Sequence, residues 1–277
     1  MTMGTEAPLG DVTVTQRLLA VAPPRGEHQA LAGGPDGLAC GYAGLATTVR
    51  AAASGLAWRG LQPGDVVGVY VPDAACYVFA AHAVRAAGGV PMPVAPALTV
   101  PEMAGQLADC GARMLLTAPP LAAAALAAAD RSWVRQVISF GDAPGATQFG
   151  TLLRTGTLRP ATGRPHDPAL LPYSRQPDGR LGPAPVSHHD MSALLHRLDR
   201  EAGIGDKDVV LAGPPAGDGR CYTALLDHAL LSGATVVAVG AEELASAADL
   251  YDGTAMIAAS SVAAGAHERL RVFAVAS

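Results

Sequence analysis

The sequence alternates short, continuously apolar runs with stretches in which apolar residues recur at helical spacing. The clearest strand-length runs are residues 66–71, 114–117, 209–212 and 235–239. Helical spacing follows them, for example at residues 74–87 and 242–251. Strands that are apolar throughout are typical of parallel sheets buried on both faces. The pattern therefore predicts an α/β fold with parallel sheets flanked by helices.

A connection rich in Gly, Thr and Pro, residues 141–166, separates two sets of these strand–helix units. We therefore predict a first α/β lobe at residues 1–160 and a second at residues 161–277. Two prolines interrupt the strand-like residues 90–94, which indicates a strand at the edge of a sheet. Thr99, with Glu102 three residues later, predicts a helix that begins with a capping box.

Composition excludes several classes of partner. The chain has 24 acidic and 19 basic residues, so neither nucleic acid nor an anionic membrane is an expected partner. The apolar run at residues 121–129 is too short to span a bilayer, and no secretory signal is recognisable at the N-terminus. The four Cys residues are widely separated and fit neither a zinc site nor a disulfide scaffold. These features predict a cytoplasmic protein.

Residues 167–191 have the layout of an anion-binding site. An apolar run at 169–173 predicts a short buried strand, and residues 188–200 predict a helix with Ser187 as its N-cap. A strand, a flexible loop and a helix N-terminus in this order favour phosphate binding, because the first backbone N–H groups of the helix lack partners. The loop at 174–187, however, contains neither Lys nor Thr.

The loop resembles the phosphate loop of the adenylate-forming acyl-CoA synthetases, the AMP-binding family that includes 4-coumarate-CoA ligase-like enzymes. That loop typically reads P-Y-S-S-G-T-T-G-L-P-K-G-V-M-L-T-H, and this chain reads P-Y-S-R-Q-P-D-G-R-L-G-P-A-P-V-S-H. The positions that agree are Pro172, Tyr173, Ser174, Gly179 and His188, and Ser187 stands where Ser or Thr is usual. Arg175 replaces the second Ser, Pro177 and Asp178 replace the paired Thr, and Gly182 replaces the Lys.

The flanking sequence extends the resemblance to nearly the whole chain. Residues 61–117 are similar to the early core of the family, and residues 224–239 are similar to a later part. The resemblance covers only about the first half of such an enzyme, so it predicts a truncated homologue without the small barrel and without the C-terminal lid domain. Strands missing from the second lobe would leave an apolar edge, which predicts a homodimer or a complex with another protein.

The resemblance implies ATP and Mg²⁺ as cofactors, but the altered loop predicts that adenylation is lost and that no cofactor is bound. The residues of this degenerate phosphate loop are Ser174, Arg175, Gly179, Gly182 and Ser187. Lys207 is the single Lys of the chain, and it matches neither Lys that the family uses. A second family landmark, which borders the acyl pocket, is also altered at residues 214–222, where Asp218 stands at the His position. A small carboxylic acid or acyl ligand remains a predicted partner, with Asp190, Arg220 and Tyr222 as candidate pocket residues.

Acid–base chemistry is an alternative use of the altered site. The two family loops meet at the active site, so His188, His189 and Asp218 are candidate catalytic residues, with a His–Asp pair acting as general base and orienter. A structural interpretation competes with this one, because His188, His189 and Asp190 also suit the start of a helix. No metal site is predicted, since adjacent helical residues point about 100° apart.

Three hypotheses follow. The first is a truncated, nucleotide-incompetent homologue that binds a ligand or a protein as an accessory in a biosynthetic pathway. The second is a repurposed enzyme that uses the remodelled pocket for acid–base chemistry without ATP. The third is half of a ligase that a second chain completes.

Overall fold

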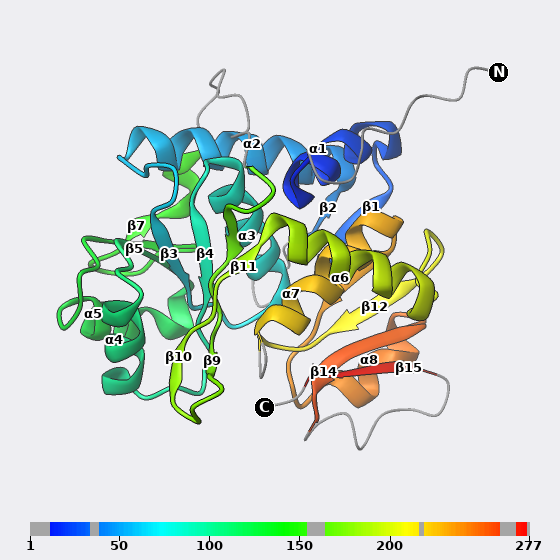
Figure 1. Ribbon diagram of the computed structural model, residues 1–277. Helices are drawn as coiled ribbons and strands as arrows, with labels where there is room; N and C mark the ends of the chain where they lie inside the picture. Colours follow the sequence, from blue (N-terminus) through cyan, green and yellow to red (C-terminus); the bar gives the residue numbers. More distant parts are fainter. Residues whose placement is uncertain (1–11, 34–38, 154–163, 216–218, 261–269, 276–277) are drawn as a thin grey trace.

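Two mainly parallel sheets with helices packed against them make up the structure (Figure 1). This computed structural model describes residues 12–33, 39–153, 164–215, 219–260 and 270–275. All neighbouring strands of the five-stranded sheet are parallel. In the six-stranded sheet only the pairing of β1 with β2 is antiparallel. The predicted α/β fold with parallel sheets flanked by helices is confirmed.

The five-stranded sheet has the strand order β4-β3-β5-β6-β7. Its strands are β3 (Val66–Val69), β4 (Val90–Pro93), β5 (Met114–Thr117), β6 (Gln136–Ser139) and β7 (Thr147–Gln148). Strand β4 lies at the edge, as its two prolines predicted. The associated helical segments are α4 (Val100–Asp109), η1 (Pro119–Leu121), α5 (Ala122–Ala129) and η2 (Phe149–Leu152). Helix α4 begins with the predicted capping box of Thr99 and Glu102.

The six-stranded sheet has the order β15-β14-β12-β13-β1-β2. Its strands are β1 (Gln29–Gly33), β2 (Cys40–Gly41), β12 (Val209–Ala212), β13 (Thr235–Ala238), β14 (Ala255–Ala259) and β15 (Arg271–Val275). Strand β1 pairs with β13, so this sheet takes strands from both sides of residue 160. Part of the predicted connection, residues 154–163, lies outside the described residues.

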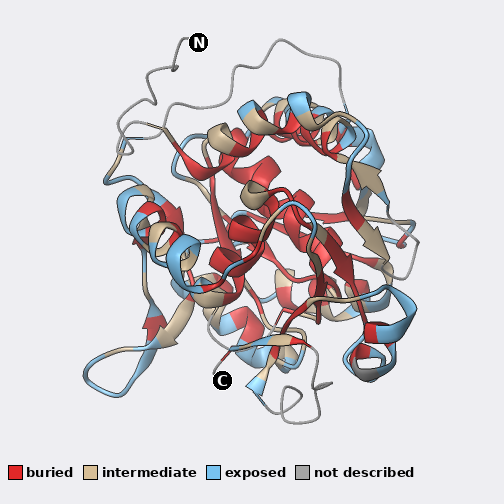
Figure 2. Cartoon of the chain, turned by 90° about the vertical axis from the view of Figure 1, so that its right-hand side faces the viewer, coloured by how far each residue is buried: buried red, intermediate tan, exposed pale blue. Residues whose placement is uncertain are grey.

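Helix α3 (Ala74–Ala86) lies between the two sheets, and every one of its residues is buried. It contacts β3 and β4 of one sheet and β1 and β13 of the other. The remaining helices are α1 (Val14–Arg25), α2 (Tyr42–Trp58), α6 (His188–Glu201), α7 (Gly219–Ser232) and α8 (Leu244–Leu250). Figure 2 shows buried residues through the middle of the molecule, with exposed residues on the outer sides of the outer helices. Within the described ranges, no helix is both long enough and apolar enough to cross a bilayer.

The segment between the sheets differs from the prediction. Residues 169–173 do not form one strand, and residues 174–187 are not an irregular loop. Strand β8 (Pro168–Leu170) pairs antiparallel with β11 (Val186–Ser187), and β9 (Tyr173–Arg175) forms a hairpin with β10 (Leu181–Pro183). Pro172 separates β8 from β9 because a proline has no N–H to donate to a strand ladder.

Candidate functional site

A cavity of about 260 Å³ lies beside the hairpin, at the carboxyl end of β4. Its lining residues come from β4 and the loop after it, α4, the start of the hairpin, the loop after β12, and the start of α7. These residues are Pro93, Val94, Ala95, Leu98, Gln106, Pro172, Tyr173, Pro215, Gly219 and Tyr222. Ligands of open α/β sheets bind beyond the carboxyl ends of the strands. This cavity is therefore the candidate ligand site.

The hairpin that carries the degenerate phosphate loop is closed by its own hydrogen bonds. The backbone N–H of Gln176 donates to the Arg180 carbonyl (2.7 Å), and that of Gly179 donates to the Gln176 carbonyl (2.9 Å). The Arg180 N–H donates to the Asp178 carboxylate (3.0 Å). Gly179 has φ +83°, which glycine adopts without strain. These three N–H groups have partners within the turn and are therefore not free to hold a phosphate.

Side chains of the loop reinforce this closure. The Arg175 guanidinium donates to the Gly179 carbonyl (2.7 Å). The Gln176 amide donates to the carbonyls of Ser174 (3.3 Å) and Gly182 (3.1 Å). Where a phosphate loop offers hydroxyls and a Lys, this hairpin therefore offers an Arg and a Gln that bond to its own backbone. Its residues do not fit a magnesium–triphosphate group.

Tyr173 fixes the base of the hairpin to α4. Its hydroxyl donates to the Asp109 carboxylate (2.7 Å). This bond, together with partial burial, raises the pKa of Tyr173 to about 12. Because an ionised phenol would lose the bond and face a carboxylate, Tyr173 stays protonated at neutral pH. It holds the hairpin in place and is not available as a base.

The structure places the two predicted catalytic histidines, His188 and His189, outside the lining of the cavity beside the hairpin. His188 is half-buried at the first turn of α6, and burial together with the Arg85 charge lowers its pKa to about 4. His189 is exposed, with its ring centroid 6.0 Å from that of His166. Asp218 lies outside the described residues.

Asp190 belongs to the cap of α6. The Ser187 hydroxyl donates to the Asp190 carboxylate (2.6 Å), and the Asp190 N–H donates back to Ser187 (3.1 Å). The predicted N-cap role of Ser187 is thus confirmed, and Asp190 completes a capping box. The hydrogen bonds from Ser187 lower the pKa of Asp190 although burial slightly opposes them, so Asp190 is ionised at neutral pH.

The three predicted pocket residues divide between two cavities. Asp190 and Arg220 line a cavity beside α6, whereas Tyr222 lines the cavity beside the hairpin. Tyr222 is buried, its hydroxyl donates to the Gly213 carbonyl (2.8 Å), and its ring meets Tyr77 edge-on at 5.3 Å. Within the described part of the chain, Tyr222 is therefore the predicted pocket residue that faces the candidate ligand site.

Sequence reasoning did not identify the close approach of Gly219 to Pro93 in the wall of this cavity. Gly219 approaches Pro93 so closely that a Cβ atom there would lie 2.8 Å from the proline ring. Gly219 begins a helix, and Pro93 ends a strand 126 positions earlier, so their contact leaves no local pattern in the sequence. Among the described residues, no group of three or more His, Cys, Asp or Glu side chains is placed to hold a metal ion.

Comparison with known proteins supplies the family. The family model described as "AMP-binding enzyme" matches residues 20–264, which is most of the chain. The chain belongs to the AMP-binding enzyme family. It is 28% identical to feruloyl-CoA synthase of Amycolatopsis sp. over 201 residues, and this alignment covers 73% of this chain and 39% of that protein. With 4-coumarate–CoA ligase 4 of Arabidopsis thaliana it shares 26% identity over 227 residues, covering 76% and 40%.

Solved structures of this family have the same fold. A long-chain-fatty-acid-CoA ligase from Archaeoglobus fulgidus superposes with a TM-score of 0.81 at 20% identity, over 94% of this chain and 54% of that one. MbtA of Mycobacterium smegmatis superposes with a TM-score of 0.79 at 26% identity, over 91% and 49%. The chain thus spans about two fifths of the length of its curated relatives and about half of these structures. The resemblance to the AMP-binding family that the sequence indicated is confirmed.

Proposed function

We propose that this AMP-binding family member binds an aryl or acyl carboxylic acid without activating it with ATP. In this proposal it acts as an accessory protein of a biosynthetic pathway in the cytoplasm. The relatives named above, a feruloyl-CoA synthase and a 4-coumarate–CoA ligase, suggest an aromatic acid as the ligand. The observation that carries the proposal is the closed hairpin at the position of the phosphate loop.

Loss of nucleotide binding follows from the donors that the hairpin lacks. A triphosphate is held by free backbone N–H groups, a Lys and hydroxyl groups in phosphate loops of known mechanism. Here three backbone N–H groups are bonded within the turn, and Gly182 stands where the Lys would be. Opening the hairpin would break these bonds, and the Lys would still be absent. The same observation counts against the hypothesis of a ligase half completed by a second chain.

Retention of an organic ligand is supported by the cavity beside the hairpin. Its walls are mostly apolar and include the rings of Pro93, Pro172 and Tyr222, which suit an aromatic ring. The Gln106 side chain, also in the lining, supplies an amide for a polar group of the ligand. Cavities with apolar walls and a few polar groups are typical sites for small molecules.

Acid–base catalysis is less well supported. A general base works best when its pKa lies near the operating pH. The pKa of His188, at about 4, makes it a weak base at neutral pH. Its ring lines a different cavity from the one beside the hairpin.

The accessory role requires a partner, and we propose a homodimer or a hetero-complex formed through the second sheet. Strand β15 lies at the edge of the six-stranded sheet, with Val272 exposed. An edge strand presents unpaired backbone groups to which another chain can add a strand.

Filling the cavity tests ligand binding. Substituting Ala95→Trp places an indole in the proposed site and is expected to weaken binding of ferulic acid at least tenfold, as measured by isothermal titration. Ala97→Trp is the matched control, because Ala97 is exposed on the same loop and does not line the cavity. Equal affinities for the two variants, or no binding of any aromatic acid by the unmodified protein, would contradict the proposal.

A further inference from the structure

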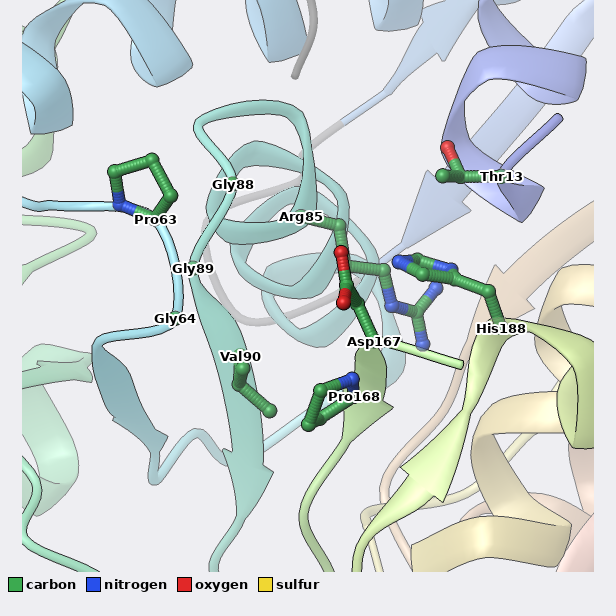
Figure 3. Close-up of a pocket in the computed structure, with 10 residues that line it drawn as sticks. All are labelled: Thr13, Pro63, Gly64, Arg85, Gly88, Gly89, Val90, Asp167, Pro168 and His188. Atoms are coloured by element: carbon green, nitrogen blue, oxygen red, sulfur yellow. The ribbon is translucent and has the colours of Figure 1, made fainter. Parts of the chain in front are cut away.

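A second cavity of about 260 Å³ lies at the opposite end of the five-stranded sheet (Figure 3). It opens where β3, β4 and β8 begin, whereas the cavity beside the hairpin lies where β4 ends. The start of α6 and the N-cap of α1 complete its walls. The proposed function does not use this place, although His188, which lines it, is the last residue of the family motif quoted above.

Arg85 of α3 brings a buried charge to this cavity. The residue is only 5% exposed. Its Nε donates to the Ala169 carbonyl (3.0 Å), and one terminal nitrogen, Nη1, donates to both oxygens of the Asp227 carboxylate (2.9 and 3.2 Å). The other terminal nitrogen, Nη2, is buried and has no hydrogen-bond partner among the described residues. A buried donor without a partner costs free energy, so a partner at this position would be favourable.

His188 brings a second nitrogen to the same cavity. Its Nδ1 is likewise buried and without a hydrogen-bond partner in the described part of the chain. Figure 3 shows the His188 ring beside the Arg85 guanidinium, with the Asp167 carboxylate on the near side. The Arg85 charge lowers the pKa of His188, second to burial, and this effect exceeds the opposing effect of Asp167. His188 is therefore neutral at pH 7.

Backbone groups around the cavity are already bonded. The N–H of Gly64 donates to the Gly88 carbonyl (2.9 Å), and that of Val90 donates to the Asp65 carbonyl (2.8 Å). At the start of α6 the His188 N–H donates to the Asp167 carbonyl (3.1 Å). A ligand would therefore be held by the side-chain nitrogens of Arg85 and His188, and not by a backbone cradle.

We propose that this cavity binds a small oxyanion, a carboxylate or a phosphate, between Nη2 of Arg85 and Nδ1 of His188. Both nitrogens donate when neutral His188 carries its proton on Nδ1, and an oxyanion accepts from both. Asp167 is exposed at the rim and accepts a hydrogen bond from the Arg164 N–H (2.8 Å). The negative charge of Asp167 disfavours a highly charged anion. The Asp167 carboxylate can, however, accept a hydrogen bond from a protonated oxygen of the phosphate.

Titration with inorganic phosphate at pH 7 tests the site, with sodium chloride added to keep the ionic strength constant. We expect saturable, one-to-one binding with a dissociation constant below about 5 mM. A parallel titration with acetate distinguishes the sources: tighter phosphate binding indicates a phosphate site, and tighter acetate binding indicates a carboxylate site. Absence of saturable binding of either ion at 1:1 stoichiometry would overturn the proposal.

Two variants with opposite expected signs locate the bound ion. His188→Phe keeps the ring but removes Nδ1, and it is expected to weaken binding about tenfold, the effect of one hydrogen bond to a charged group. Asp167→Asn removes the rim charge while keeping an acceptor for Arg164, and it is expected to strengthen acetate binding about threefold. His189→Phe is the matched control, since His189 is exposed and does not line the cavity.

Arg85 is kept in every variant, because removing it would leave the buried Asp227 carboxylate without its guanidinium partner. Circular dichroism of each variant checks that the fold is retained. Unchanged affinity in His188→Phe, or weaker acetate binding in Asp167→Asn, would show that ions bind elsewhere and would overturn the proposal.

Discussion

Substituting Asp227→Asn is expected to lower the free energy of unfolding by about 3–5 kcal/mol, the usual cost of removing one partner of a buried ion pair. Asp227 and Arg85 are 3% and 5% exposed, and their charged atoms are 2.9 Å apart. Asparagine is nearly the same size as aspartate, so packing is preserved while the Arg85 charge loses its compensation. Urea unfolding at pH 7 measures the change.

An exposed ion pair provides the control for Asp227→Asn. Arg197 and Glu201 on α6 are 3.8 Å apart, with side chains 59% and 63% exposed. Glu201→Gln is expected to change the free energy of unfolding by less than about 0.5 kcal/mol. If the two substitutions lowered the free energy of unfolding by similar amounts, burial of the Arg85–Asp227 pair would not be the cause of the loss.

The effect of Asp227→Asn should depend on pH. Burial alone would raise the pKa of Asp227, but the Arg85 charge holds it below the ordinary 3.8. A carboxyl group with a lowered pKa contributes stability above its unfolded pKa and loses it as the pH falls through the folded value. The difference between wild type and variant is therefore expected to be full at pH 7 and to shrink below about pH 4.

Substituting Gly55→Ala is expected to destabilise the protein by about 2–3 kcal/mol, although alanine is the better helix former. Gly55 lies in the last turn of α2, where the backbone of η2 packs against it. An added Cβ would lie 2.6 Å from the Cα atom of Leu152 and closer still to its carbonyl oxygen. Backbone atoms cannot move aside as a flexible side chain can, so α2 or η2 must shift. Thermal and urea unfolding measure the loss.

Gly105 in α4 is the matched control for Gly55. A Cβ atom at Gly105 meets nothing within 4 Å. Gly105→Ala is therefore expected to stabilise the protein by up to about 1 kcal/mol through helix propensity alone. If Gly55→Ala and Gly105→Ala changed the free energy of unfolding in the same direction, close packing of α2 on η2 would not explain the effect of Gly55→Ala.

The parallel sheets were predictable because their strands are apolar throughout. The edge position of β4 followed from Pro91 and Pro93, and the start of α6 followed from Ser187. Each of these signals is local: a residue type fixes a backbone geometry or a hydrogen bond close to itself in the sequence. The same locality explains the failure at residues 169–187, where tight turns and prolines concealed four short strands in two antiparallel pairs.

The sites were less predictable than the fold because distant residues form them. Arg85 meets Asp227 across 142 positions, and the partner of Tyr173 lies 64 positions away. His188 and Asp190 line different cavities because residues at the start of α6 point in different directions, and Tyr222 of α7 lines a third cavity. The family resemblance located the degenerate loop, but only the structure showed that its backbone is already bonded.

Isothermal titration of Mg·ATP into the pure protein tests the central claim most directly. The closed hairpin predicts no saturable heat at millimolar nucleotide, with or without ferulic acid, under conditions in which the Arabidopsis 4-coumarate–CoA ligase serves as the positive control. Binding tighter than about 0.1 mM, worth more than roughly 5 kcal/mol, would contradict it. That result would mean that the hairpin opens to hold a triphosphate without the lysine.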